Sequence, residues 1–535
     1  MSRSPISRWR WWAWAAITIH FAAFLLLGLS RHWGYMTSIN DLGVFDQAVW
    51  GTMHGQFLLN TSVFNQPINW LGFHFHPVLL LFVPLYAISP SAEWFVLAQA
   101  AALSFAAWPI FLLASRVCQS EKAGMLWTLA YLVNPFLLSA AAWDFHPVAL
   151  AVPFIALGML AVEKADRRLL LLSCLPLLFI QEQLGLTVAV FGFLWWLRNK
   201  RWKTAVSLIL LGIAHAALVL GVIMPALSPS GALWMLGNGT SQLSRYGWVG
   251  HSVSEVAQTL LTHPLAVLEA LILQTDGASY LGLLLLPFLG FPLASGAFLL
   301  PGLPDLLANL LSANPMPRSV FAYHSSTLVP VLTTAAIYGS VRISRWQKRF
   351  SVIELTGLAL VASIVAGFGL GPLPLPGAST VWAPRHFMNQ PDPALPAVHA
   401  AVGDSTSVSA QGNIGAHFSQ RREIYLYPNK AKEVDAIVLW LDSPTTKLHP
   451  QDPGKDASLA WHLQMRPAEY LASIECLLSG KEYGILLWQD PWLVFSRNTM
   501  NIAPQREIEL KLLRLRQEWE ISADEYLAAL KTCKK

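Results

Sequence analysis

The residues best suited to chemistry in this 535-residue chain are histidines and carboxylates placed next to apolar segments. The tetrapeptide Phe75-His76-Pro77-Val78 recurs as Phe145-His146-Pro147-Val148, each time at the start of an apolar stretch. Proline suits the first turn of a helix and pushes the preceding residue toward extended geometry. The polar residues two positions before each histidine, His74 and Asp144, should therefore project to the same side as that histidine. The spacing predicts two pairs of polar groups at a membrane boundary.

Each pair has a structural and a functional interpretation. A histidine at a helix start can cap the helix or lie among lipid headgroups, whereas recurrence of the whole pattern favours a function. Imidazole and carboxylate groups can bind a divalent metal ion, and imidazole favours a zinc-like ion over magnesium. The candidate metal ligands are His74, His76, Asp144 and His146.

Glu182 lies between two short apolar segments, residues 169–181 and 184–197, whose far flanks are basic. This arrangement predicts a hairpin whose turn, Gln181-Glu182-Gln183, lies below the outer surface in a water-filled or protein-lined cavity. Its alternative is a solvated hairpin tip. An ionisable residue at membrane depth is a functional candidate, so Glu182 is taken as one.

Two further carboxylates, Asp41 and Asp46, lie in the loop after the first apolar segment. The apolar residues that share one helical face here predict a helix lying flat on the membrane surface; they are Leu42, Phe45, Val49 and Met53. Asp41 would begin that helix, where capping explains it structurally. Asp46 lies roughly 140° further round the helix, so the spacing alone does not predict a carboxylate pair.

The composition is that of a membrane protein, with 54% hydrophobic and 13% charged residues. Soluble proteins average about 25% charged residues, so a mainly soluble enzyme, a disordered chain and a fibre are excluded. Phosphate-binding loops and nucleophile motifs are missing, and no basic, aromatic-rich surface predicts a nucleic-acid partner. Of the 67 charged residues, 35 lie in residues 371–535. We therefore predict a membrane domain (1–370, first outer loop 30–76), a proline-rich linker (371–377) and an outer domain (378–535).

Eleven apolar segments are predicted to cross the membrane: 11–29, 93–115, 123–143, 147–163, 169–181, 184–197, 204–224, 278–294, 296–312, 323–341 and 351–370. Segment Pro77–Ile88 is too short and is predicted to be re-entrant or interfacial. The positive-inside rule places the basic clusters and the N-terminus in the cytoplasm and the C-terminal domain outside. This predicts a multi-pass protein of the inner (plasma) membrane. Three arginines then face outward: Arg31, Arg245 and Arg318.

The outer domain has the pattern of a small α/β fold. Strands are predicted at Ile424–Tyr427, Ala436–Leu441, Tyr483–Trp488 and Trp492–Ser496, and a helix at Pro467–Leu478. A later stripe at helical spacing, Ile508, Leu512, Leu515 and Trp519, is predicted to pack against the domain. Cys476 and Cys533 would face an oxidising compartment, where they can pair.

The first apolar segment, the loop with Asp41 and Asp46, the two His-Pro motifs and the Glu182 hairpin follow one another in this order. In this they resemble a family of bacterial and archaeal membrane proteins that is classified as a domain of unknown function. The resemblance covers nearly the whole chain, and its most specific part is Val408–Tyr425. This chain has Gln181-Glu182-Gln183 where a Lys-Glu-Asp-like turn is usual, and Val148 where an acidic residue commonly follows His-Pro. The family in turn resembles the GT-C superfamily of membrane glycosyltransferases.

The GT-C resemblance implies an inverting transfer of sugar from a polyprenyl-phosphate carrier to an acceptor outside the membrane. It makes Asp41 the candidate base for the acceptor hydroxyl, with Asp46 second and Glu182 a further catalytic candidate. Phosphate would be bound by Arg31, Arg245, Arg318 and His324, and the divalent metal ion would assist. The implied partners are a lipid-linked sugar and membrane lipid.

Two other functions stay open from the sequence. A proton- or metal-coupled transporter would use Glu182 and the histidines. A non-catalytic envelope scaffold would use the outer domain to bind an envelope partner.

Overall fold

The computed structural model describes residues 7–237, 244–274, 276–377, 387–404, 406–443, 459–460 and 462–533. Of residues 273, 274 and 533 it describes the backbone alone. The chain divides into two compact units. Unit 1 comprises Met1–Gly28, Trp70–Leu79 and Phe95–Trp382, and unit 2 comprises Leu29–Asn69, Leu80–Trp94 and Ala383–Lys535.

This grouping differs from the predicted division of the chain at residues 371–377. Residues 29–69 and 80–94, predicted to belong to the membrane domain, group with the C-terminal residues. Tyr35 and Ile39 contribute to an apolar core with the C-terminal strands, and Tyr86 donates a hydrogen bond to Asp46. The predicted start of the outer domain, residue 378, lies outside the described residues.

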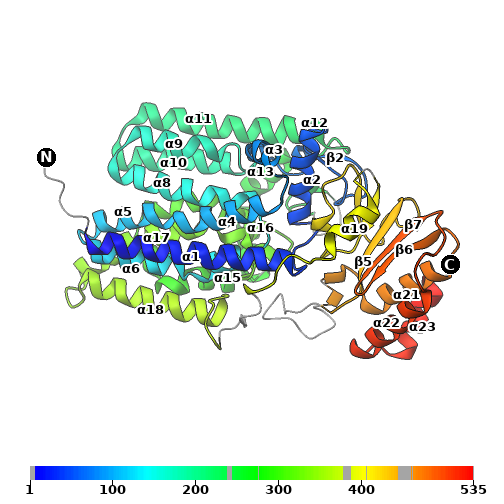
Figure 1. Ribbon diagram of the computed structural model, residues 1–535. Helices are drawn as coiled ribbons and strands as arrows, with labels where there is room; N and C mark the ends of the chain where they lie inside the picture. The colour runs from blue at the N-terminus through cyan, green and yellow to red at the C-terminus, as the bar shows by residue number, and fades with distance from the viewer. Residues whose placement is uncertain are drawn as a thin grey trace. The chain divides into compact units, whose positions relative to one another are not determined.

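Unit 1 is helical, as Figure 1 shows from α4 in blue to α18 in yellow-green. Helices α1 (Arg8–Trp33) and α4 (Glu93–Phe105) are shared with unit 2. The other helices are α5 (Ala107–Val117), α6 (Glu121–Leu132), α7 (Pro135–Ala142), α8 (Ala151–Lys164), α9 (Arg167–Leu177), α10 (Leu184–Asn199), α11 (Trp202–Leu218), α12 (Met224–Leu227), α13 (Val253–Thr262), α14 (Pro264–Glu269), α15 (Gly277–Leu285), α16 (Leu303–Leu311), α17 (Leu328–Trp346) and α18 (Val352–Leu370).

Five helical stretches among the described residues are long and apolar enough to cross a membrane: Arg8–Trp33, Glu93–Val117, Pro147–Lys164, Trp202–Leu227 and Val352–Leu370. Two bent helix pairs raise the number to seven if each pair is one span. The apolar helix Pro77–Ile88 is short, as predicted. The count of eleven crossings stays a prediction.

The predicted hairpin around Glu182 is present as α9 and α10. Pro176 lies in the last turn of α9, where its ring opposes continuation of the helix, and α10 begins seven residues after α9 ends. The helices have 11 and 16 residues, fewer than the roughly 20 that a span needs. Helix α10 packs closely on α11, since a Cβ at Gly212 would lie 2.3 Å from the carbonyl oxygen of Gly185. The α9–α10 turn is thus held by its neighbours.

Unit 2 contains a five-stranded sheet in the order β4-β3-β5-β7-β6. Strand β3 pairs in parallel with β4 and β5, and β7 pairs antiparallel with β5 and β6. The strands are β3 (Val408–Ala410), β4 (Ile424–Leu426), β5 (Ala436–Trp440), β6 (Tyr483–Gln489) and β7 (Trp492–Arg497), and a separate pair is β1 (Leu59–Asn60) with β2 (Ile68–Asn69). The helices are α2 (Leu42–Met53), α3 (Val83–Ile88), α19 (Leu395–Val402), α21 (Pro467–Ser479), α22 (Gln505–Glu518) and α23 (Ala523–Cys533).

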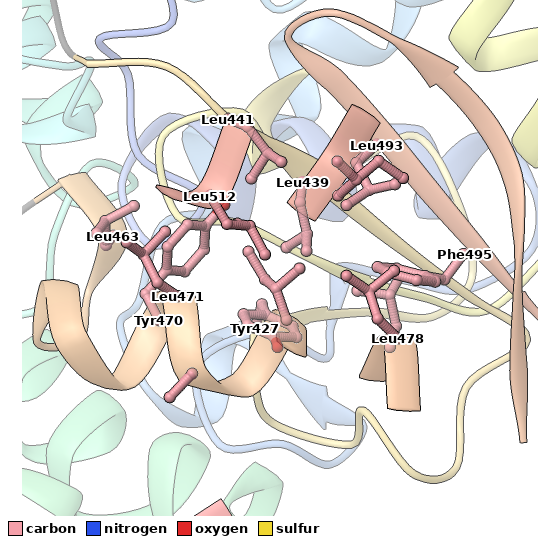
Figure 2. Close-up of a cluster of buried hydrophobic side chains, with 14 of the residues drawn as sticks. Tyr427, Leu439, Leu441, Leu463, Tyr470, Leu471, Leu478, Leu493, Phe495 and Leu512 are labelled. Carbon is pink, nitrogen blue, oxygen red and sulfur yellow. The ribbon is translucent and has the colours of Figure 1, made fainter. Parts of the chain in front are cut away.

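The sheet is covered on both faces, because successive side chains of a strand point to opposite sides. On one face Leu439, Leu493 and Phe495 meet side chains of α21 and α22 in a buried cluster that Figure 2 shows. The stripe predicted to pack against the domain, Ile508 to Trp519, belongs to this cluster. On the other face Val438 and its neighbours meet α19 and the segment around Ile39. The predicted strands and the helix at Pro467 are confirmed, whereas β3 and α19 are additional.

Helix α2 does not lie with one face free, as the sequence predicted for a surface helix. Nine of its 12 residues are buried, on all sides of the helix. Gly43 permits a close approach, since a Cβ there would lie 3.3 Å from the Cα of Ala416. Three residues of the predicted stripe, Leu42, Phe45 and Val49, are therefore packed within the protein, whereas Met53 is exposed.

Candidate functional site

Two neighbouring histidines of unit 1 precede the short helix η2 (Pro77–Phe82). The amide of Val78 donates to the carbonyl oxygen of Phe179 at 2.8 Å, which ties this loop to the end of α9. The rings of His74 and His76 are stacked, with centroids 5.4 Å apart and planes 12° apart. The two side chains therefore project to the same side, as their spacing around proline predicted.

Glu182 lies in the α9–α10 turn and contacts this loop directly. Its side chain is buried, and Oε1 lies 2.9 Å from Nδ1 of His74. Its second oxygen, Oε2, accepts the backbone N–H of Phe75 at 3.0 Å. A buried carboxylate needs such partners, because an unpaired one would be strongly destabilising. Glu182 is thus oriented by the loop whose histidines it meets.

His74, His76 and Glu182 form a group that can hold a metal ion. Each offers one ligand atom, and the three atoms all lie within 4.8 Å of one another. His76 is also buried, and its Nδ1 accepts the indole N–H of Trp70 at 3.0 Å. Since indole nitrogen only donates, Nδ1 of His76 carries the lone pair, and the proton of a neutral ring is on Nε2.

The second predicted pair, Asp144 and His146, is not part of this group. The amide side chain of Gln99 fixes their segment: its Nε2 donates to the carbonyl oxygens of Ala140 and Trp143, at 3.0 and 2.9 Å. Its Oε1 accepts the backbone N–H of His146 at 3.0 Å. The His146 ring lies within electrostatic range of His76. The pair therefore lies beside the metal-capable group and does not complete it.

Three rings stack in a row, from His146 through Tyr323 to His324. The ring of Tyr323 stacks on His146, with centroids 3.4 Å apart, and on His324, with centroids 4.1 Å apart. His324 lies within electrostatic range of Arg245, His146 and His74. Neither of its ring nitrogens has a hydrogen-bond partner among the described residues. The histidines and Arg245 thus form one polar neighbourhood, built from segments far apart in the chain.

Asp305 and Gln183 are further polar residues of this neighbourhood that were not assigned a role from the sequence. The Gln183 side chain donates to Oδ1 of Asp305 at 3.2 Å, and Asp305 is buried. Tyr246 lies within electrostatic range of Asp305 as well as of Glu182 and Arg245. A carboxylate within the first turn of an apolar helix, α16, was the available sequence signal.

Two of the predicted phosphate-binding arginines are bound to backbone carbonyls. Arg318 of unit 1 donates from Nη1 to the carbonyl oxygens of Asn309 and Ser312 at 3.1 and 2.6 Å. It thereby gives hydrogen bonds to carbonyl oxygens at the C-terminal end of α16, where carbonyl groups have no partner within the helix. Arg31 of unit 2 donates in the same way to the carbonyl oxygen of Met36 at 3.1 Å. Both guanidinium groups are buried, so these contacts give them a structural role.

Asp41 and Asp46, the carboxylates of the loop after the first helix, belong to unit 2 and differ in their burial and hydrogen bonds. Asp41 precedes α2 and makes no side-chain hydrogen bond that caps it, contrary to the structural alternative for this residue. Asp46 is buried and accepts hydrogen bonds from Tyr86 (2.6 Å), Ser419 (2.6 Å) and Gln420 (3.1 Å). Burial raises the pKa of Asp46 above its usual range, against the opposing effect of these three bonds.

Comparison with protein families matches residues 31–463 to a family described as "Predicted membrane protein (DUF2079)". The chain belongs to this family. The matched range contains every candidate site residue, from Arg31 to His324. The family description and the apolar helices together establish a membrane protein.

Among solved structures, two crystal structures of the Archaeoglobus fulgidus oligosaccharyltransferase are similar to this member of the family. One is the apo form (12% identity, TM-score 0.33), and the other is tethered with an acceptor peptide containing the NVT sequon (11% identity, TM-score 0.32). Each comparison covers 86% of this chain and 72% of the other. TM-scores of this size do not establish a shared fold. No curated protein matches the sequence.

Proposed function

We propose that this protein is a membrane glycosyltransferase that transfers a sugar from a polyprenyl-phosphate carrier to an acceptor outside the cytoplasm. The observation that carries the proposal is the gathering in unit 1 of ionisable side chains from separate segments. They come from the loop before η2, the α9–α10 turn, the segment before α8 and the residues before α17. Buried ionisable groups brought together in this way are typical of functional sites.

The phosphate of the donor would bind beside His324 and Arg245. These two groups lie within electrostatic range of each other, and the imidazole nitrogens of His324 have no hydrogen-bond partner among the described residues. Guanidinium groups bind phosphate by charge-assisted hydrogen bonds. Arg31 and Arg318 are already bound to carbonyl oxygens, so Arg245 and His324 are the stronger candidates.

The acceptor hydroxyl would lose its proton to a carboxylate. Asp41 remains the first candidate because it is only partly buried. Asp46 is the weaker candidate, since three hydrogen bonds already hold its two oxygens. A direct displacement at the sugar carbon breaks its bond to phosphate as the acceptor oxygen bonds, and requires no protein nucleophile.

A disulfide supports an extracytoplasmic position for the C-terminal domain. Cys476 in α21 is disulfide-bonded, whereas Cys118 and Cys174 are free thiols. The side chain of Cys533, predicted as its partner, lies outside the described residues. Disulfides persist in oxidising compartments and are rare in the cytoplasm. An extracytoplasmic C-terminal domain agrees with the proposed topology, in which a cytoplasmic N-terminus is followed by eleven crossings.

The test is transfer of radiolabelled sugar from polyprenyl phosphate to envelope acceptors by the purified, full-length protein in lipid vesicles. We expect transfer by the wild type and its loss in Asp41→Asn, with Asp524→Asn, an exposed carboxylate of the same unit, fully active. Full activity of Asp41→Asn would remove Asp41 from the reaction but not the reaction itself.

Absence of transfer across a panel of lipid-linked sugars would overturn the proposal. Uptake of zinc into sealed vesicles, lost in Glu182→Gln, would then identify a metal-coupled transporter. Retention of an envelope protein by this chain, with neither activity, would identify a scaffold.

A further inference from the structure

Two imidazoles and one carboxylate converge at the loop before η2, and this ligand set has a known chemical preference. His76 and Glu182 are 4% exposed, and the side chain of His74 is 23% exposed. Two histidines and a glutamate are a set found in catalytic zinc sites, where three protein ligands leave a fourth position open. We infer that His74, His76 and Glu182 bind one divalent transition-metal ion of the zinc class, whose open position accepts a phosphate oxygen.

The distance between the first two ligand atoms fits one ion. Nδ1 of His74 and Oε1 of Glu182 are 2.9 Å apart. Two ligands of a tetrahedral zinc ion are about 3.3 Å apart, given bond lengths near 2.0 Å. The ion would take the place of the proton between these two atoms, and in a neutral ring that proton moves to Nε2 of His74, so that Nδ1 offers its lone pair to the ion. Because the Phe75 N–H holds Oε2 at 3.0 Å, the carboxylate needs little rearrangement.

The third ligand, His76, is restrained by Trp70. The indole N–H donates to Nδ1 of His76 at 3.0 Å, which places the proton of the neutral ring on Nε2. Binding through Nε2 must expel that proton, and binding through Nδ1 must displace the indole. In either case Trp70 opposes metal binding, so its donor weakens the site.

The choice of ion and its role follow from the neighbouring groups. Imidazole ligands favour zinc-like ions, whereas magnesium and calcium prefer oxygen ligands. His324 lies within electrostatic range of His74 and of Arg245, so an anion bound to the ion would also lie near the Arg245 guanidinium and the imidazole of His324. The phosphate part of the inference rests on the proposed function; the metal site does not.

The direct test is the zinc content of tag-free, full-length protein in lipid nanodiscs after chelator treatment, reloading with zinc and removal of excess metal. We expect one zinc per chain by mass spectrometry of the elements. Glu182→Gln and His76→Phe should each weaken binding at least about 100-fold in competition with a zinc indicator. His263→Gln, which alters an exposed histidine of unit 1, is the matched control and should bind like the wild type.

A second measurement needs no variant and so does not depend on how the variants fold. The X-ray absorption spectrum of the zinc-loaded wild type should show two imidazole ligands and oxygen ligands at about 2.0–2.2 Å. Zinc bound no more tightly than in Glu182→Gln, or lost instead in Asp144→Asn, would overturn the inference. Zinc binding without sugar transfer would overturn the proposed function alone, and transfer at the full rate by the metal-free protein would overturn the phosphate-binding role of the ion alone.

Removal of the Trp70 donor gives the sharpest form of the test. Trp70→Phe keeps an aromatic ring but lacks the N–H that restrains His76. We expect zinc affinity to rise by about tenfold, the equivalent of one hydrogen bond. Unchanged affinity in a Trp70→Phe protein that elutes as a single folded species would show that His76 is not a ligand.

Discussion

Asp46 of unit 2 and Glu182 of unit 1 are both buried carboxylates, but they contact different kinds of partner. Asp46 of unit 2 is 1% exposed and accepts hydrogen bonds from a phenol, a hydroxyl and an amide, none of which carries a charge. Glu182 of unit 1 is 4% exposed and is shared between a backbone N–H and an imidazole, which can exchange protons or ligate a metal. Burial is therefore common to both carboxylates, and the chemistry of their partners distinguishes them.

The largest expected effect is that of a Glu182 variant of unit 1 on the rate of sugar transfer. We expect Glu182→Gln to lower the rate of sugar transfer about 100-fold, because the amide cannot hold His74 as the carboxylate does. The thermal unfolding midpoint should change little, since the amide oxygen can still accept the Phe75 N–H. The matched control is Glu269→Gln, at an exposed position of the same unit, which should keep full activity. A large fall in the unfolding midpoint with unchanged activity would reverse the assignment of roles.

The corresponding change in unit 2 should affect stability instead. Asp46→Ala leaves three donors without an acceptor, and we expect the free energy of unfolding to fall by about 3 kcal/mol. Chemical denaturation of the purified protein measures this, with Asp524→Ala as the exposed control. Near-normal stability combined with lost sugar transfer would return Asp46 to the catalytic candidates.

Arg245 and Arg318 should differ in the same way, one affecting donor binding and the other stability. Arg245→Gln should raise the KM for the lipid-linked donor about tenfold, because one charge-assisted contact to phosphate is lost. Arg318→Gln should instead lower the unfolding midpoint, since its donors satisfy the carbonyls of Asn309 and Ser312. Steady-state kinetics at several donor concentrations distinguish the two, with the exposed Arg201→Gln as control. An unchanged KM in Arg245→Gln would place phosphate binding elsewhere.

The smallest expected effect concerns pH. The pKa of Asp46 is raised in the folded protein, mainly by burial, so its neutral form is favoured there. Its contribution to stability is present below about pH 4 and is lost as the pH rises through the folded pKa. Between pH 4 and pH 7 the wild type should therefore lose stability relative to Asp46→Asn. Thermal unfolding of both proteins at the two pH values measures the difference, and a constant difference would contradict the raised pKa.

Local features of both units could be predicted from the sequence. Alternation and turn residues located β5, β6 and β7, helical spacing located the stripe from Ile508 to Trp519, and proline located the paired histidines. These predictions hold because each depends on residues close together in the chain.

Long-range contacts could not be predicted in this way. Nothing in the spacing indicates that Glu182 meets His74, that Gln99 fixes the segment of His146, or that Ser419 meets Asp46. Such contacts join residues that packing brings together. The apolar stripe of α2 was assigned to lipid for the same reason: periodicity identifies a buried face but not what covers it.

The face of the five-stranded sheet that packs on Tyr35 and Ile39 has a consequence for the way this protein can be made and handled. Tyr35 and Ile39, which follow the first helix, complete an apolar core with Trp440, Trp492 and Val494. During synthesis, the side chains of Tyr35 and Ile39 can complete this core only after several hundred later residues have been made. A fragment that starts at the proline-rich linker would leave those tryptophans facing water, so expression of residues 371–535 alone should give aggregates unless the early loop is supplied alongside it.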